Sequence, residues 1–180
     1  NTMIYVGRID QEQKNILMLL EAIKILSTKI KEFSLLIIGD GPDYQSLISQ
    51  IKSLKLNDSI TIFQNINDDQ LVWFYRESRL FVLANLLLEN GDCEGAPNVI
   101  VEAASFGLPV IAGIEGGTSD VVENDISGFL INPLDHEALS NKIITLIKDN
   151  NLRDMMSSNS LLKVKRDHNQ VTAGEKFRKI

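Results

Sequence analysis

Short apolar runs that end in turn residues alternate with longer amphipathic stretches along this 180-residue chain. Short apolar runs are typical of strands buried on both faces, and apolar residues at steps of three and four are typical of helices. Strands are therefore expected at residues 3–6, 35–38, 60–63, 80–83, 110–112 and 128–131. Because helical stretches separate them, the pattern predicts a six-stranded parallel sheet with helices on both faces, a doubly wound, Rossmann-like α/β domain.

Helices are expected over residues 15–29, 47–54, 70–77, 97–106 and 135–148. Proline suits the first turn of a helix, as at Pro97, and an aspartate such as Asp135 can cap one. The pair Asp68 and Asp69 is expected to cap the following helix, with a metal site as the alternative. Residues 84–96 lack periodicity, so a long loop with a functional role is expected there.

Charge restricts the classes of function. The net charge is −6, and residues 150–180 hold 7 of the 18 basic but only 3 of the 24 acidic side chains. An acidic balance disfavours nucleic-acid binding, because phosphate backbones attract a basic face. The basic tail is expected to be a solvated helix face. An anionic membrane surface and an acidic partner domain are the alternatives.

The single cysteine, Cys93, excludes a disulfide framework and suits a reducing compartment. No apolar run approaches the roughly 20 residues that cross a bilayer, so a cytoplasmic protein is expected. The chain opens at Asn1 without an initiator methionine and enters a strand within three residues, as a piece of a longer protein would. We therefore expect one domain over 1–180, with a core at 1–149 and a basic helical tail at 150–180.

Two cations follow the first expected strand, at the sheet edge where doubly wound domains bind ligands. Arg8 comes directly after Gly7, and Lys14 stands at the expected start of the next helix. A guanidinium and an ammonium at this edge would suit a diphosphate. The alternative is two surface cations with nothing bound.

Two carboxylates flank the helix start after the fourth expected strand. Glu94 precedes it, and Glu102 lies about 7.5 Å along the helix axis from Pro97. Free backbone amides in the first turn of this helix favour an anion bound between the two carboxylates. This arrangement suits a ligand with phosphate in the middle and hydroxyl groups at both ends. Alternatively, Glu94 complements the helix dipole and Glu102 is an exposed helix residue.

Other motifs are ambiguous or missing. Gly116 and Gly117 would let the backbone approach a ligand or adopt a positive φ. The chain has no complete GxGxxG, no GxxxxGK[ST] and no GxSxG, which disfavours dehydrogenase, P-loop and serine-hydrolase chemistry.

In order along the chain, several motifs resemble the carboxyl-terminal domain of glycosyltransferase family 4. They are Val6-Gly7-Arg8, Lys14, the turn at 39–42, Glu94 with Glu102 eight positions on, the segment 102–110, Gly116-Gly117, the segment 128–133 and Asp135. The resemblance implies one lobe of a two-lobed GT-B enzyme that retains anomeric configuration without an obligatory metal or cofactor. The amino-terminal lobe, which holds the acceptor site, is absent from this chain.

The resemblance also implies residue roles. Arg8 and Lys14 would contact the diphosphate of a nucleotide-sugar donor, with UDP favoured over GDP. Glu94 would face the donor sugar, and Glu102 would hold the ribose hydroxyls. The remaining donor-binding positions are Gly7, Gly95, Asn98, Val99, Ile100 and, at the base, Asn65 and Ile66. A glycan or lipid-linked acceptor would bind through the other lobe, in bacterial surface polysaccharide synthesis such as that of lipopolysaccharide.

Three residues depart from the usual pattern of that family: Asn15 and Asn65 stand where glycine is common, and Asp120 stands where glutamate is common. A nucleotide-sugar 2-epimerase shares the two-lobed architecture and is the alternative enzyme. A non-catalytic scaffold domain of the doubly wound type is the alternative without activity.

Overall fold

A six-stranded sheet positions every other element in this computed structural model, which describes residues 1–85 and 98–167. All strand pairs are parallel, in the order β3-β2-β1-β4-β5-β6. The strand bounds are Thr2–Val6 (β1), Ser34–Ile38 (β2), Ile60–Phe63 (β3), Leu80–Leu83 (β4), Val110–Gly113 (β5) and Gly128–Ile131 (β6). The expected doubly wound sheet is confirmed.

The middle of the sheet is apolar. Every residue of β4 and β5 is buried, as is every residue of β1 after Thr2. A parallel strand covered on both faces must bury both sets of alternating side chains, so such strands read as continuous apolar runs. This burial is why the sequence pattern located these strands to within one residue.

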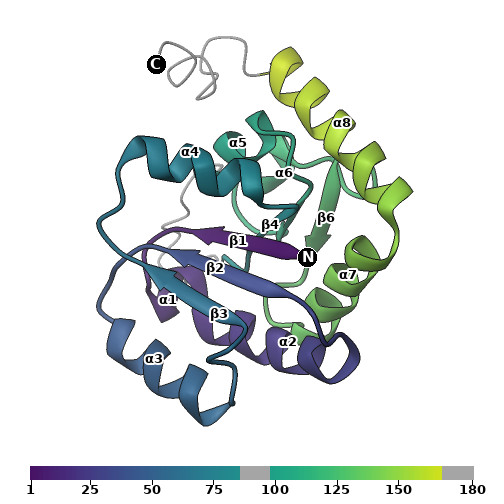
Figure 1. Ribbon diagram of the computed structural model, residues 1–180. Coiled ribbons are helices and arrows are strands. Elements are labelled where there is room, and N and C mark those ends of the chain that lie inside the picture. Colours follow the sequence, from purple (N-terminus) through teal and green to yellow (C-terminus); the bar gives the residue numbers. More distant parts are fainter. Residues whose placement is uncertain (86–97, 168–180) are drawn as a thin grey trace.

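Helices cover both faces of the sheet (Figure 1). The helix bounds are Gln11–Lys14 (α1), Ile16–Lys29 (α2), Tyr44–Ser53 (α3), Asp68–Glu77 (α4), Asn98–Ser105 (α5), Thr118–Val121 (α6), His136–Lys148 (α7) and Asn150–Asp167 (α8). One face carries α2, α3 and α7, and the opposite face carries α4, α5 and α6. The chain changes face between β3 and β4, which sets the order of the strands.

The start of α4 differs from the expectation. Asn67 is its N-cap, because the Asn67 side chain accepts a hydrogen bond from the Gln70 amide and the Gln70 side chain accepts one from the Asn67 amide, both at 2.9 Å. This reciprocal capping box satisfies two amides at once. The prediction that Asp68 and Asp69 cap the helix was wrong. They occupy its first turn, where negative charge is favourable.

The described part of the expected tail is the 18-residue helix α8, which packs against α5 and α7. Its buried face consists of Arg153, Met156, Ser160 and Val164. The Ser160 hydroxyl donates to the Leu108 carbonyl (3.1 Å), and the Arg153 guanidinium donates to the Leu146 carbonyl (3.0 Å). Residues 150–167 therefore form a helix that packs onto the sheet domain through one face, while Lys165 and Arg166 are exposed, as expected of a solvated basic face. The expected tail beyond Asp167 lies outside the described residues.

The loops after β1 and β2 continue side by side past the ends of their strands. The Gly7 amide donates to the Ile38 carbonyl (3.0 Å), and the Ile9 amide donates to the Asp40 carbonyl (2.9 Å). A Cβ atom at Gly39 would overlap the Gly7 carbonyl oxygen, and one at Gly41 would overlap the Ile9 carbonyl oxygen. Only glycine permits this close approach of two backbones.

We predict that Gly39→Ala lowers the free energy of unfolding by about 2 kcal/mol, within the range found for overpacked sites. The added methyl group must displace backbone, which cannot rotate away as a side chain can. Chemical denaturation measures the change. Ser49→Ala, on the exposed face of α3, is the control and should change stability by less than about 0.5 kcal/mol. Equal stability of Gly39→Ala and the unsubstituted protein would contradict the packing described here.

Candidate functional site

The loops after β1 and β4 flank the point where the strand order reverses. These two strands are neighbours, with Met3 opposite Leu80 and Ile4 opposite Phe81. The chain leaves β1 toward α2 on one face and leaves β4 toward α5 on the other. Doubly wound domains bind their ligands beyond the carboxyl ends of the strands at such a switch point.

Arg8 lies at this edge, directly after β1 and Gly7. Its side chain is 65% exposed and lies 3.5 Å from the Asp10 carboxylate, while its carbonyl accepts a hydrogen bond from the Tyr5 hydroxyl (2.8 Å). Only the arginine end of this ion pair is exposed, because the Asp10 side chain is 17% exposed. The guanidinium therefore remains accessible to an anionic ligand, while Tyr5 holds the backbone in place.

Lys14 differs from the expectation of a helix start. It ends the four-residue helix α1, and Asn15 separates α1 from α2 with left-handed φ and ψ of 46° and 44°. The Lys14 side chain is buried, at 7% exposure. Charge interactions are stronger in such a low-dielectric position than in water.

The Asn15 side chain connects two loops at this edge. The Asn15 side-chain NH₂ group donates to the Pro133 carbonyl (2.6 Å), after β6. The Asn15 side-chain oxygen accepts from the Gln11 side-chain NH₂ group (3.0 Å). The Gln11 oxygen in turn accepts from the Leu17 backbone amide (2.9 Å). Sequence reasoning missed this network. The preference of asparagine for left-handed backbone was the available signal.

Asn65 and Ile66 follow β3 on the other side of β1. Asn65 is exposed and has a φ of 53°, again in the left-handed region. Both asparagines at usual glycine positions thus adopt backbone that glycine favours and that asparagine tolerates best among other residues. The neighbouring Gln64 side chain donates to Asp40 (2.8 Å), which connects the β3 and β2 loops.

The helix α5 begins at this edge, after β4. Asn98 is exposed, Val99 is half-buried and Ile100 is fully buried in the core. Amides in the first turn of a helix lack partners within the helix, so they can receive an anion. Glu102 is half-buried and stands one turn further along. The amides predicted to bind the phosphate and the carboxylate predicted to bind the ribose therefore belong to one helix, α5.

Glu102 has a partner that sequence reasoning missed. The Tyr75 hydroxyl, from the last turns of α4, donates to Glu102 Oε2 at 3.2 Å. Tyr75 is 1% exposed. Burial first, and the Glu102 charge second, raise the pKa of Tyr75 above its usual value. Its position on the buried face of α4 with Val72 indicates burial but does not indicate this partner.

Several expected features receive no placement. Glu94, Gly95 and Cys93 lie outside the described residues. Gly116 has a φ of 71°, in the left-handed region that glycine adopts readily, and Gly117 directly precedes α6. The pair therefore forms a turn before that helix. Among residues 1–85 and 98–167, no three histidine, cysteine, aspartate or glutamate side chains are grouped as a metal site. Metal independence stays a prediction.

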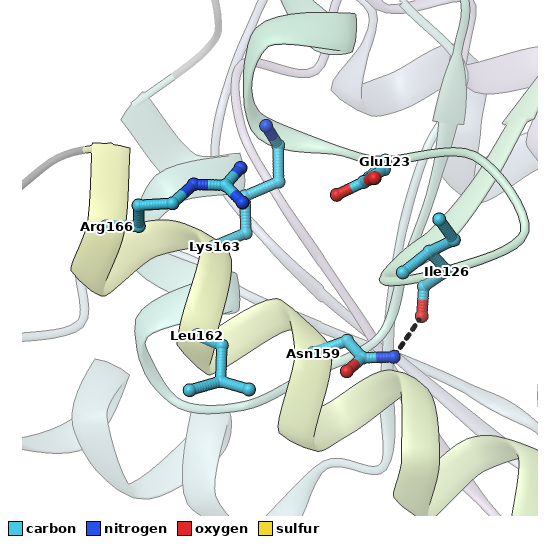
Figure 2. Close-up of a pocket in the computed structure, with 6 residues that line it drawn as sticks. All are labelled: Glu123, Ile126, Asn159, Leu162, Lys163 and Arg166. Atoms are coloured by element: carbon cyan, nitrogen blue, oxygen red, sulfur yellow. Dashed lines mark hydrogen bonds between the residues drawn. The ribbon is translucent and has the colours of Figure 1, made fainter.

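A hollow of about 320 Å³ lies between α8 and the loop before β6, at the amino ends of the strands. Figure 2 shows its lining residues, Glu123, Ile126, Asn159, Leu162, Lys163 and Arg166. The Arg166 guanidinium and the Lys163 ammonium both bind Asp167 and hold the pKa of that carboxyl below its usual value. This hollow lies apart from Arg8 and the start of α5.

No described helix combines the length and the apolar character that a membrane crossing requires.

Fold and site together define a class: a doubly wound domain with an exposed arginine after β1 at its switch point and a carboxylate one turn inside the adjoining helix. Residues 1–162 match the family described as "Glycosyl transferases group 1". The chain therefore belongs to this family, and the expectation of a glycosyltransferase domain is confirmed at that level.

One similar relative is the capsular polysaccharide biosynthesis glycosyltransferase CapM of Staphylococcus aureus, 31% identical over 161 residues and 89% of this chain. The chain spans only 28% to 40% of the length of CapM and two other relatives that are at least 30% identical.

Solved structures share the fold. The C-terminal domain of a glycosyl transferase group 1 family protein (LpcC) from Francisella tularensis is 22% identical, has a TM-score of 0.81 and aligns over 93% of this chain and 86% of its own. Anabaena Alr3699/HepE, solved in complex with UDP and glucose, is 24% identical, has a TM-score of 0.79 and aligns over 92% of this chain and 44% of its own. The GT-B carboxyl-terminal fold is thereby confirmed.

The two left-handed asparagines should respond differently to glycine. Asn15→Gly keeps the backbone but loses the buried bonds to Pro133 and Gln11, and should lower the free energy of unfolding by about 1–3 kcal/mol. Asn65→Gly loses no side-chain hydrogen bond that the described structure shows, and should change it by less than about 0.5 kcal/mol. Urea denaturation of both variants measures the difference. Equal losses would contradict the network around Asn15.

Proposed function

We propose that this chain is the donor-binding lobe of a family 4 retaining glycosyltransferase, which transfers a hexosyl group from a nucleotide sugar to a glycan or lipid-linked acceptor. The observation that carries the proposal is the gathering of Arg8, the start of α5 and Glu102 at the β1–β4 switch point of a chain that matches the group 1 family. The structure of HepE with UDP and glucose supports the choice of UDP over GDP.

The diphosphate would lie between Arg8, Lys14 and the first amides of α5. Charge develops on the leaving nucleoside diphosphate as the bond from the sugar anomeric carbon to the phosphate oxygen breaks. Preorganised cations and amides stabilise that charge without reorganising during the reaction. In this proposal they do the electrostatic work that a metal does elsewhere, so no metal or cofactor is required.

The two ends of the donor would be held by other residues. Glu102 accepts hydrogen bonds from the ribose hydroxyls, and Asn65 and Ile66 line the base. Glu94 and Gly95 would face the donor sugar, with Glu94 orienting an oxocarbenium-like sugar rather than attacking it. The acceptor hydroxyl oxygen then bonds to the anomeric carbon on the face from which the diphosphate leaves, which retains the configuration, and the hydroxyl proton passes to the departing phosphate oxygen.

The acceptor would come from a second lobe. The chain spans a minority of the length of its relatives, so we propose that it binds donor alone but transfers sugar only within a longer protein. The role of CapM in capsular polysaccharide biosynthesis favours bacterial surface polysaccharide as the product. A cytoplasmic location, with peripheral contact to the membrane that carries a lipid-linked acceptor, belongs to the same proposal.

Isothermal titration calorimetry with UDP, GDP and ADP tests donor binding. We expect one of the three to bind, and Arg8→Met to weaken that binding by roughly tenfold, because a charge-assisted hydrogen bond is lost. Since Arg8 is exposed, its removal should leave stability almost unchanged. Arg79→Met is the matched control, because Arg79 is an exposed arginine directly before β4, at the opposite edge of the sheet. Binding of none of the three, or equal weakening by both substitutions, would contradict the proposed site.

A further inference from the structure

We propose that Tyr75 is a positioning residue for donor recognition: its hydroxyl orients the Glu102 carboxylate toward the ribose. This inference rests on the proposed function, because it takes Glu102 as the ribose ligand. It assigns a role in the donor site to α4, for which the sequence indicated only a cap or a metal site at Asp68 and Asp69.

The contact between Tyr75 and Glu102 joins two helices. Tyr75 belongs to α4 and Glu102 to α5, and the hydroxyl oxygen lies 3.2 Å from Glu102 Oε2. The tyrosine is 1% exposed, whereas Glu102 is half-buried. The bond therefore connects a buried hydroxyl to a carboxylate that is only partly buried.

The Tyr75 ring is itself held in place. It stacks on Phe106, with ring centroids 5.1 Å apart and an interplanar angle of 14°. The Phe106 amide donates to the Glu102 carbonyl at 3.2 Å, so Phe106 is attached to the same turn as the carboxylate. The Ser78 amide donates to the Tyr75 carbonyl (3.3 Å), which fixes the Tyr75 backbone. Displacement of the hydroxyl oxygen away from Glu102 would require the ring to leave its stacking on Phe106.

The direction of the hydrogen bond is also determined. Burial and the Glu102 charge raise the pKa of Tyr75, so the hydroxyl stays protonated and donates. An ionised carboxylate offers about four acceptor positions on its two oxygens. The bond from Tyr75 uses one of these positions, so it does not by itself prevent Glu102 from accepting bonds from ribose hydroxyls.

A bond that holds one oxygen of a carboxylate restricts the rotation of the whole group. If Tyr75 acts in this way, its loss affects only ligands whose hydroxyls use the carboxylate. A purely structural role would affect every nucleotide equally, whether or not its ribose carries hydroxyls. Ligand chemistry therefore separates the two roles within one variant.

The test is calorimetric titration of the protein with UDP, GDP and ADP, each beside its 2′,3′-dideoxy analogue. Tyr75→Phe keeps the ring and its stacking on Phe106 but removes the hydroxyl. Ser78→Ala is the matched control, because it removes a buried hydroxyl at the same end of α4, one that donates to the Phe74 carbonyl (2.7 Å). Tyr75→Phe is also made in a Glu102→Ala background, and thermal melts confirm that each variant is folded.

We expect Tyr75→Phe to weaken binding of the preferred diphosphate by roughly tenfold and that of its dideoxy analogue by less than about twofold. Ser78→Ala should weaken neither, and Tyr75→Phe should have no further effect once Glu102 is alanine. Equal weakening of both ligands by Tyr75→Phe, or weakening of neither, would overturn the role of Tyr75 while leaving donor binding intact. An unsubstituted protein that binds no diphosphate, or does not prefer it to the dideoxy form, would overturn the proposed function and this inference together.

Discussion

The burial of a parallel sheet on both faces restricts polar function in this domain to the ends of its strands. β1 lies in the middle of the sheet, between β2 and β4, and none of its residues after Thr2 is exposed enough to contact a ligand. Backbone and side chains become available only where each strand ends. Since all six strands are parallel, their carboxyl ends meet at one edge, and the loops there bring together residues as distant in sequence as Arg8 and Glu102.

Close approach of backbone at this edge depends on residues that tolerate unusual conformations. Gly39 and Gly41 let the β1 and β2 loops run alongside one another, and Asn15 adopts left-handed backbone between α1 and α2. Asn15 also gains a buried hydrogen bond to Pro133 that glycine could not make. Asparagine thus adopts left-handed backbone at both Asn15 and Asn65. Only Asn15 also connects distant loops through its side chain, because Asn65 is exposed.

The fold was largely predictable from sequence, because periodicity reports burial directly. The strands β3, β4 and β6 begin and end at the expected residues, and Asp135 caps α7 through the Ala138 amide (2.8 Å) as expected. Local alternatives were less predictable: Asp68, Asp69 and Asn67 all suit an N-cap, and the reciprocal bonds with Gln70 select Asn67. The bond from Tyr75 to Glu102 was beyond prediction, because it joins helices whose relative placement is set by the whole sheet. Placement of Glu94 and Gly95, outside the described residues, stays a prediction.

The most direct test of this account is an NMR titration of the ¹⁵N-labelled protein with the nucleoside diphosphate that binds most tightly. The account predicts that backbone amide shifts change at the carboxyl edge of the sheet, in Gly7, Arg8 and the first turn of α5. Amides around the hollow between α8 and the loop before β6 should stay unchanged, because that hollow lies at the opposite edge. Shift changes centred on α8, or spread evenly over both edges, would contradict the central claim that the β1–β4 switch point is the donor site.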